Sequence, residues 1–141
     1  MKATHRLIVH GLMKLEGKFL VIKRTQIKRG KPNSYPGYYD IPGGMVEDGE
    51  LPTEALLREI KEETNLDAKI IKIIHEDSNL DKDKGIVFTR LVYLCNLENS
   101  NVNNIKLQED EHEKYLLIDN LNEMKKEKLV DYVEEVISNY K

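Results

Sequence analysis

Residues 44–66, GMVEDGELPTEALLREIKEETNL, predict a glycine-containing turn that leads into an amphipathic helix. Each helical residue turns by about 100° about the axis. At this spacing Glu59, Glu62 and Glu63 share one edge of the helix. Four residues of the neighbouring arc form the stripe that would dock on a core: Leu56, Leu57, Ile60 and Thr64. The acidic edge therefore borders the buried face of the helix.

Three like charges at these spacings repel one another by a few tenths of a kcal/mol per pair, a penalty that a bound cation would reverse. Oxygen ligands without a neighbouring Cys or His favour Mg²⁺, with Mn²⁺ as the second choice, and Mg²⁺ often takes substrate phosphates as further ligands. A solvated surface helix with an Arg58–Glu62 pair is the alternative for the same residues.

The segment before the helix favours a ligand site over a plain surface helix. IPGG at 41–44 and DGE at 48–50 place three glycines and a proline in a short loop, where backbone groups can approach a ligand closely. Pro52 suits the first helical turn, because its missing N–H is no loss there. Asn65 tolerates the left-handed conformation that ends many helices. The expected start and end of the helix therefore agree with its acidic edge.

The run resembles the box of the Nudix family, which reads Gly, five residues, Glu, seven residues, Arg-Glu, an aliphatic, any residue, Glu-Glu, any residue, Gly, an aliphatic. Eight positions match at that spacing: Gly44, Glu50, Arg58, Glu59, Ile60, Glu62, Glu63 and Leu66. Asn65 stands in place of the second glycine. Upstream, YDIPGG at 39–44 resembles the lead-in of the family, with Tyr39 where Trp is frequent.

This resemblance implies an α/β fold, an α/β/α sandwich with a mixed sheet, and metal-dependent hydrolysis of a nucleoside diphosphate linked to another moiety. It implies that Glu59, Glu62 and Glu63 bind Mg²⁺ or Mn²⁺, with a backbone oxygen from Gly43 or Gly44.

Two further residues are expected at the site. Arg58 lies off the acidic edge, so we expect it to orient carboxylates such as Glu50 or Glu62. Family members often recruit one more acid from a later loop. In the acidic cluster before Lys114, Glu111 is our choice for a further ligand or the general base, and a solvated acidic loop is the alternative.

The rest of the chain predicts one domain over residues 1–141. Strands are expected near 5–14, 18–24, 68–75, 86–97 and 114–118, with a polar loop over 25–38 and a second amphipathic helix over 122–140. These elements indicate a mixed sheet with helices on both faces. Cys95 lies in an apolar strand and is expected to be a core residue.

The composition of the chain narrows the classes of partner that we expect it to bind. Charged residues make up 33% of the chain and the net charge is −3, which favours neither a nucleic-acid partner nor a membrane surface. The chain has no apolar segment of membrane-spanning length, so we expect a cytoplasmic protein. The expected partner is a small nucleotide, with capped or triphosphorylated RNA left open. A homodimer is compatible with the sequence, which does not fix the oligomeric state.

On the substrate side, Arg24 at a strand end is expected to clamp phosphates, in preference to the loop residues Lys28, Arg29 and Lys31. Tyr39, like two neighbouring tyrosines, has a ring that can stack on a base, or it can belong to the core. The four histidines show no metal-ligand spacing and are expected to be structural: His5, His10, His75 and His112.

The residues that follow the box bear on the substrate. Relatives acting on ADP-ribose or dinucleoside polyphosphates often carry Pro or Tyr about fifteen to eighteen residues beyond the box, where this chain has residues 81–84, DKDK. We therefore expect a MutT-like nucleoside triphosphate pyrophosphohydrolase that releases a nucleoside monophosphate and pyrophosphate. The alternatives are an ADP-ribose or nucleotide-sugar hydrolase, an RNA 5′-end pyrophosphohydrolase, and a non-catalytic nucleotide-sensing module. An isoprenoid diphosphate isomerase would need a cysteine in the cleft, and Cys95 does not fit.

Overall fold

The computed structural model describes residues 3–98 and 101–140. In chain order the elements are β1 (Thr4–Leu15), β2 (Lys18–Arg24), β3 (Ile27–Lys28), β4 (Lys31–Pro32), β5 (Tyr39–Asp40), β6 (Gly43–Met45), α1 (Pro52–Thr64), β7 (Ala68–Asp81), β8 (Ile86–Leu97), the 3₁₀ turn η1 (Val102–Asn104), β9 (His112–Ile118), the 3₁₀ turn η2 (Leu121–Met124) and α2 (Asp131–Tyr140). Among these residues no helix is long and apolar enough to cross a membrane.

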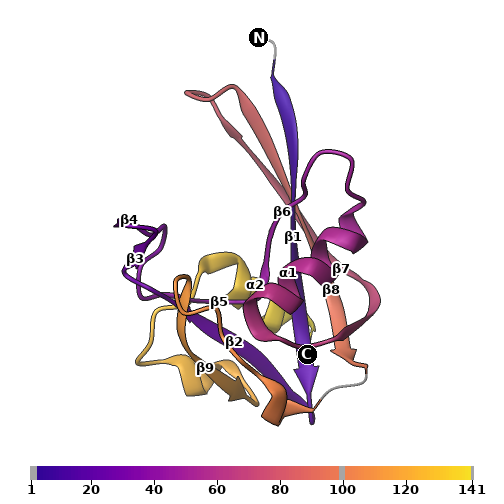
Figure 1. The fold of residues 1–141 in the computed structure, drawn as a ribbon, viewed down its shortest axis with the longest axis vertical. Helices are drawn as coiled ribbons and strands as arrows, with labels where there is room; N and C mark the ends of the chain where they lie inside the picture. Colours follow the sequence, from indigo (N-terminus) through magenta and orange to yellow (C-terminus); the bar gives the residue numbers. More distant parts are fainter. Residues whose placement is uncertain (1–2, 99–100, 141) are drawn as a thin grey trace.

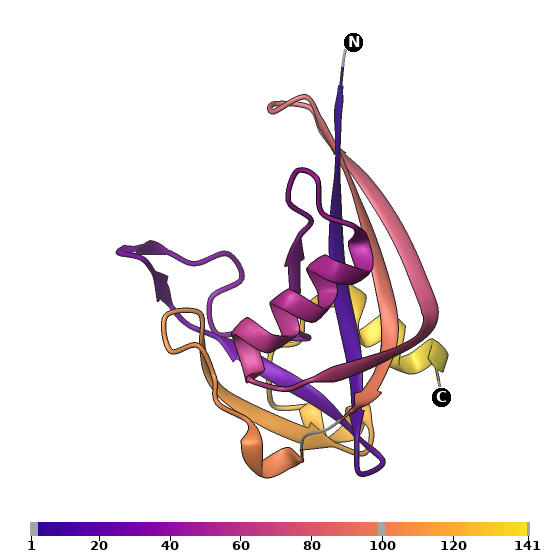
Figure 2. The same ribbon diagram turned by 45° about the vertical axis from the view of Figure 1, so that its right-hand side comes forward.

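Strand β1 is the centre of a seven-stranded mixed sheet with the path β5-β2-β1-β8-β7. It runs parallel to β8, whereas β7 pairs antiparallel with β8 and β9 pairs antiparallel with β2. Helix α1 crosses one face of the sheet and α2 lies on the other face (Figures 1 and 2). The expected α/β fold with a mixed sheet between helices is confirmed.

Strands β1 and β2 separate soon after their connecting turn. They pair only at Lys14–Phe19 and Leu15–Lys18, and beyond that point β6 pairs with β1 while β5 pairs with β2. The two halves of the sheet therefore diverge next to the N-terminal part of β1. Polar side chains from β1, β2 and β5, together with the glycine pair of β6, line the resulting opening.

Each face of the sheet has its own hydrophobic core. Leu56 and Ile60 of α1 pack on one face, and Val133 and Ile137 of α2 pack on the other. Gly11 of β1 lets α1 approach closely, because a Cβ there would lie 3.0 Å from Ile60 Cδ1. Both helices are thus fixed by apolar contacts that leave their polar edges free.

Helix α1 has the expected ends. Pro52 is its first residue, and the Leu51 N–H donates to Glu54 Oε1 at 2.8 Å. Asn65 ends the helix in the left-handed conformation with φ 65°, and its N–H donates to the Lys61 carbonyl. The expectation for Leu57 is wrong, since this side chain is 41% exposed and lies outside the core.

The second helix is shorter than expected. It begins at Asp131, not at residue 122, and the preceding segment forms the turn η2 and then an extended stretch. The Tyr39 N–H donates to the Lys128 carbonyl and the Val130 N–H donates to the Tyr39 carbonyl, so this stretch pairs beside β5. These backbone bonds hold the chain extended where its side chains alone favour a helix.

Two other boundaries differ from expectation. Strand β7 continues to Asp81, because it pairs with β8 along the whole hairpin down to a tight turn at Gly85. The polar loop over 25–38 contains the short hairpin β3–β4. Cys95 is buried as expected, and burial raises the pKa of its thiol to about 12.

Candidate active site

Three of the four glutamates of α1 face one cavity, each at a different depth. The Glu62 side chain is 50% exposed, Glu59 is 16% exposed and Glu63 is 5% exposed. All three line a cavity of about 610 Å³. The acidic edge therefore runs from the surface into the interior, which agrees with its expected place beside the buried face.

The glycine pair of β6 places backbone against these carboxylates. The Gly43 N–H donates to Glu63 Oε2 at 2.9 Å. A Cβ on Gly43 would lie 2.1 Å from the Val9 carbonyl oxygen, and a Cβ on Gly44 would lie 2.7 Å from the Glu59 carboxylate. Only glycine fits at position 43, where a Cβ would meet backbone, whereas a Cβ at position 44 would displace the Glu59 carboxylate.

Arg58 holds the acidic side chains in place. Its guanidinium donates to Glu50 at 2.7 and 3.0 Å, to Glu59 at 2.9 Å and to Glu62 at 3.3 Å. The Arg58 hydrogen bond keeps the pKa of Glu50 down at about 2, and the same carboxylate raises the pKa of Arg58. The geometry matches an orienting residue, with the donors of Arg58 directed at carboxylates.

Burial acts on the two inner glutamates in the opposite direction. Desolvation raises the pKa of Glu59, and it raises the pKa of Glu63 well above its ordinary value. Loss of water makes a carboxylate hold its proton more tightly, and for Glu59 the neighbouring Arg58 guanidinium offsets this effect only in part. These two side chains would therefore be stabilised as anions by a positive charge in the cavity.

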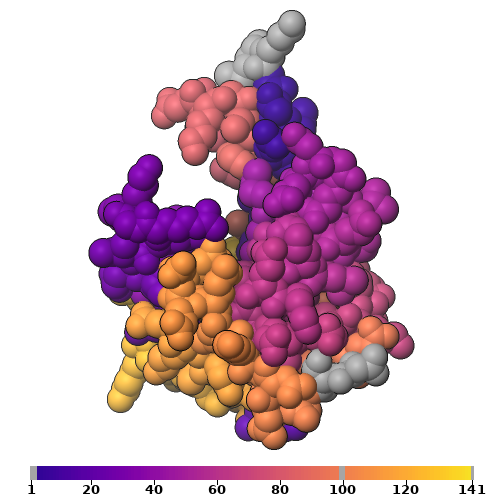
Figure 3. All heavy atoms as spheres, viewed as in Figure 1, coloured from indigo at the N-terminus to yellow at the C-terminus, as the bar shows by residue number. Residues whose placement is uncertain are grey.

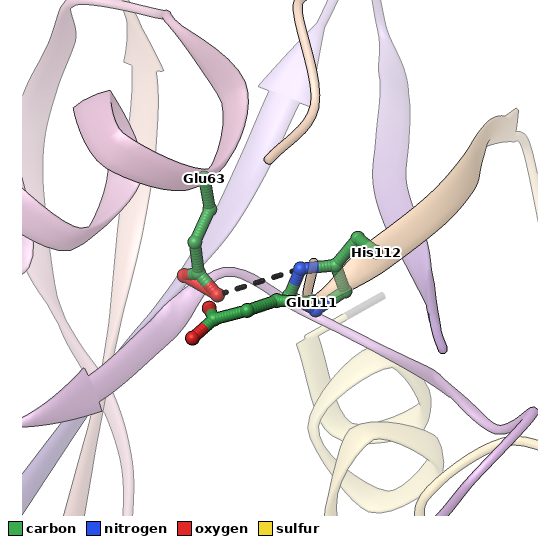
Figure 4. A group of neighbouring side chains, drawn as sticks. All are labelled: Glu63, Glu111 and His112. Atoms are coloured by element: carbon green, nitrogen blue, oxygen red, sulfur yellow. Dashed lines mark ion pairs between the residues drawn. The ribbon is translucent and has the colours of Figure 1, made fainter. Parts of the chain in front are cut away.

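The turn before β9 brings Glu111 to the same place. Thr25 anchors this turn, because its N–H donates to the Glu111 carbonyl and its hydroxyl donates to the Asp110 carbonyl. The Glu111 carboxylate lies near Glu63 (Figure 4) and forms an ion pair with Lys28 Nζ at 2.6 Å. The structure thus brings Glu111 together with the glutamates of α1.

Positively charged side chains form the opposite wall. The β3–β4 hairpin and the turn before β9 face α1 across the hollow that is visible in Figure 3. Besides Arg58 of α1, the cationic residues that line the cavity are Arg24, Lys28, Arg29 and Arg90. The cavity therefore has carboxylates on the α1 side and cationic side chains, together with Glu111, on the opposite side.

Arg24 is already engaged with the protein. Its Nε donates to the Ser34 carbonyl at 2.7 Å, and its terminal nitrogens donate to Asp40, Asn33 and the Ser34 hydroxyl. It lies in the cavity wall as expected, but its donors hold the loop before β5. Lys28, which pairs with Glu111, and Arg29 are the other cations of that loop in the cavity lining, and the sequence favours Arg24 over both.

The expectation that Tyr39 contacts substrate is wrong. Tyr39 is 0% exposed, packs in the core on the α2 side and is absent from the cavity lining. Strand alternation explains the difference, because neighbouring Asp40 takes the cavity side. Tyr35 does line the cavity, so it is the tyrosine with a ring available for stacking.

Several cavity residues were not expected from the sequence. His10, Asp40, Arg90 and Tyr132 form its deep end. The Tyr132 hydroxyl donates to Asp40, and the Arg90 guanidinium lies 3.8 Å from the centre of the Tyr132 ring. Burial lowers the pKa of His10 to about 4, so this imidazole is neutral at neutral pH. These residues come from four separate elements, and no local spacing links them.

His112 was expected to be structural, and it too lies in the site. It is the first residue of β9 and pairs with Arg24 of β2. Burial lowers its pKa to about 4, and its Nδ1 lies 3.8 Å from Glu63 Oε1. Its position next to Glu111 in the sequence was the one available signal.

The residues present fit a divalent cation. Three carboxylates of α1 converge on one cavity, two of them desolvated, and the Gly44 backbone lies against Glu59. Oxygen donors of this kind suit Mg²⁺ or Mn²⁺.

The NUDIX domain family model matches residues 4–139. An ADP-ribose pyrophosphatase of Methanocaldococcus jannaschii is 41% identical over 75 residues, which are 53% of this chain and 41% of that protein. A putative 8-oxo-dGTP diphosphatase of Bacillus subtilis is 42% identical over 60 residues, which are 43% of this chain and 37% of that protein. The aligned stretches thus span less than half the length of either relative.

Solved structures share the fold over nearly the whole chain. A MutT protein of Methanosarcina mazei superposes with a TM-score of 0.77 at 22% identity, covering 99% of this chain and 95% of that one. A MutT NUDIX hydrolase of Burkholderia pseudomallei superposes with a TM-score of 0.76 at 21% identity, covering 96% and 97%. This likeness establishes the common fold.

Proposed function

The chain belongs to the NUDIX family, and on that premise we propose that it is a divalent-metal-dependent nucleotide pyrophosphohydrolase. Its substrate is a nucleoside triphosphate, and its products are a nucleoside monophosphate and pyrophosphate. The observation that carries this proposal is the cavity of about 610 Å³ with the α1 glutamates on one side and cationic side chains on the other. That volume lies in the usual range for small-molecule sites.

The metal would be held by Glu59, Glu62 and Glu63, with a backbone oxygen from Gly44. When bound, a divalent cation such as Mg²⁺ or Mn²⁺ neutralises diphosphate charge and lowers the pKa of a bound water. Glu63 is fixed for this task by the Gly43 N–H. Arg58 keeps the side chains of Glu59 and Glu62 in position without needing to contact substrate.

The opposite wall would bind the phosphates that the carboxylates repel. Lys28 and Arg29 supply positive charge at the β3–β4 hairpin, and charge-assisted hydrogen bonds to phosphate are short and strong. The ring of Tyr35 is available at the same wall to stack on the base. The proton released by the attacking water passes to a carboxylate of the site, for which Glu111 is our candidate.

Two observations support a triphosphate substrate. The residues at which ADP-ribose and dinucleoside polyphosphate hydrolases often carry Pro or Tyr are 81–84 here. Asp81 ends β7 and residues 82–84 lie in the β7–β8 turn, all of them outside the cavity lining. A relative named as a putative 8-oxo-dGTP diphosphatase aligns at 42% identity. ADP-ribose is the second candidate, because the similarity to a protein named ADP-ribose pyrophosphatase extends over more of this chain.

The test is the release of phosphate and pyrophosphate with Mg²⁺ across ordinary and oxidised nucleoside triphosphates, ADP-ribose, a dinucleoside polyphosphate and triphosphorylated RNA. We expect pyrophosphate and a nucleoside monophosphate from a triphosphate, and no turnover by Glu63→Gln. Turnover of ADP-ribose alone would favour the second candidate. Metal-dependent nucleotide binding without any turnover would overturn the enzyme proposal in favour of a sensing module.

A further inference from the structure

A second group of metal-ligating side chains lies at the inner end of the acidic row. The group consists of Glu63 of α1, Glu111 of the turn before β9 and His112, the first residue of β9. Each offers one ligand atom, and these atoms all lie within 4.8 Å of one another. Figure 4 shows the two carboxylates and the imidazole turned toward one another from two separate elements. Glu63 and His112 are both buried, so bulk water solvates neither side chain well.

One ring nitrogen of His112 lacks a hydrogen-bond partner among the described residues. Its Nδ1 is buried, and within residues 3–98 and 101–140 it has no hydrogen-bond partner. Glu63 Oε1, at 3.8 Å, lies beyond hydrogen-bonding distance. Because buried polar atoms in proteins nearly always have a partner, an unpartnered nitrogen directed at two carboxylates marks a place for a ligand.

We propose that His112 is a metal ligand, and that Glu63, Glu111 and His112 together bind a first-row transition dication such as Co²⁺ or Zn²⁺ in preference to Mg²⁺. An imidazole nitrogen suits these metals, whereas Mg²⁺ takes oxygen ligands almost exclusively. Glu59 and Glu62 offer oxygen alone and keep the Mg²⁺ preference of the outer end. This inference rests on the proposed function in placing metal at this side of the cavity.

The position of Lys28 shows that Glu111 attracts a positive charge at this point. Its ammonium group lies 2.6 Å from Glu111 Oε1, so the metal-free protein already places a positive charge against this carboxylate. A metal ion bound by Glu111 would take over that neutralisation. The hairpin that carries Lys28 stays attached to the Glu111 turn through Thr25, so this exchange does not require the wall to open.

The experiment measures the binding of Co²⁺ alone and of Mg²⁺ alone to the full chain by equilibrium dialysis, without nucleotide. In His112→Gln we expect Co²⁺ affinity to fall by about tenfold or more, and Mg²⁺ affinity to change by less than about twofold. The matched control is His10→Gln. His10 is also buried, lines the same cavity and has an unpartnered Nδ1, yet it lies outside the cluster. It should keep the wild-type ratio of the two affinities.

Proton NMR of the Co²⁺-loaded protein gives a second readout. A coordinated imidazole produces a strongly shifted resonance of its other ring N–H, which should be present in wild type and His10→Gln and absent in His112→Gln. Equal losses of Co²⁺ and Mg²⁺ affinity in His112→Gln would show that His112 only supports Glu63, and would overturn the inference. A shifted resonance that survives in His112→Gln would do the same. Failure of wild type to bind either ion would overturn the proposed function as well.

Discussion

Glu63 is the residue on which the proposed chemistry depends most, because it is the deepest carboxylate of the acidic row and is held by the Gly43 N–H. We expect Glu63→Gln to lower metal-dependent turnover by about a hundredfold or more. Stability should stay the same or rise, since a neutral amide relieves repulsion in the metal-free protein and its oxygen can still accept from Gly43. Turnover assays and urea unfolding test both parts.

The control for Glu63→Gln lies on the same helix. Glu54 is exposed and outside the cavity lining, and glutamine at this position can still accept the Leu51 N–H. Glu54→Gln should therefore leave turnover unchanged. Full activity of Glu63→Gln with Mg²⁺ would show that the site assignment is wrong.

His10 should make the fold sensitive to acid. Burial lowers its folded-state pKa to about 4 from 6.5, so the unfolded chain binds the proton more readily. The stabilisation is complete above pH 6.5 and is lost as the pH falls toward 4, by about 3 kcal/mol in all. His112 has the same direction and a similar value. Of the fall in the free energy of unfolding that His10 and His112 together cause between pH 7 and 4, His10→Gln should therefore remove about half. Urea unfolding at several pH values in this range measures it. An unchanged pH dependence would contradict a neutral His10 in the folded state.

Single residues also show where sequence reasoning stops. The shared edge of Glu59, Glu62 and Glu63 follows from helical periodicity, which is a local property, and the structure places all three in one cavity. The role of His112 depends on the pairing of β9 with β2, which places it beside Glu63. No spacing within the sequence encodes that register, so the histidine looked structural.

At the end of helix α1, Asn65 replaces the glycine of the family pattern. Its φ of 65° lies in the left-handed region, and its side-chain amide donates to the Asn104 carbonyl at 3.1 Å. Asn65→Gly and Asn65→Ala both lose that hydrogen bond, but only alanine is strained by the backbone conformation. We expect Asn65→Ala to be less stable than Asn65→Gly by about 1 kcal/mol in urea unfolding. Equal stability of the two variants would mean that this turn relaxes on substitution.

Lys28 of the β3–β4 hairpin should weaken metal binding and strengthen phosphate binding. Lys28→Met removes the ammonium group that pairs with Glu111. We expect the affinity for a divalent cation to rise about two- to fivefold, as for loss of a partly exposed ion pair, while KM for the nucleotide increases. Lys31→Met is the matched control, because Lys31 is on the same hairpin but is exposed and outside the cavity lining. A fall in metal affinity for Lys28→Met would contradict competition between the two cations.

The boundaries of an element were predicted well where nearby residues determine them. They were predicted poorly where backbone pairing with a distant part of the chain determines them. Pro52 and Asn65 bounded α1 because capping depends on nearby residues. The start of α2 was misplaced because Tyr39 pairs with the backbone at residues 128–130, about ninety positions away in the chain. The extension of β7 to Asp81 likewise depends on its pairing with β8.

The whole molecule places its cavity between two cores that sit on opposite faces of the sheet. Helix α1 supplies the acidic wall from one core, and Tyr132 of α2 reaches the deep end from the other. Asp40 joins these parts, since it accepts from the Tyr132 hydroxyl, from Arg24 and from the Ile41 N–H. The position of α2 is thereby linked to the loop that leads into the glycine pair.

Tyr132→Phe tests this link. The substitution keeps the ring under the Arg90 guanidinium and removes only the hydroxyl, so it leaves the buried Asp40 carboxylate with one donor fewer. We expect a loss of about 2 kcal/mol in the free energy of unfolding, the usual cost for a buried hydrogen bond to a charged group. Tyr115→Phe, on β9 with 40% exposure, should change it by less than about 0.5 kcal/mol. Tyr132 has no role in the proposed chemistry. Turnover should therefore fall only if the loop that leads to Gly43 and Gly44 shifts. Equal, small effects of the two substitutions would show that α2 is held by its apolar face alone.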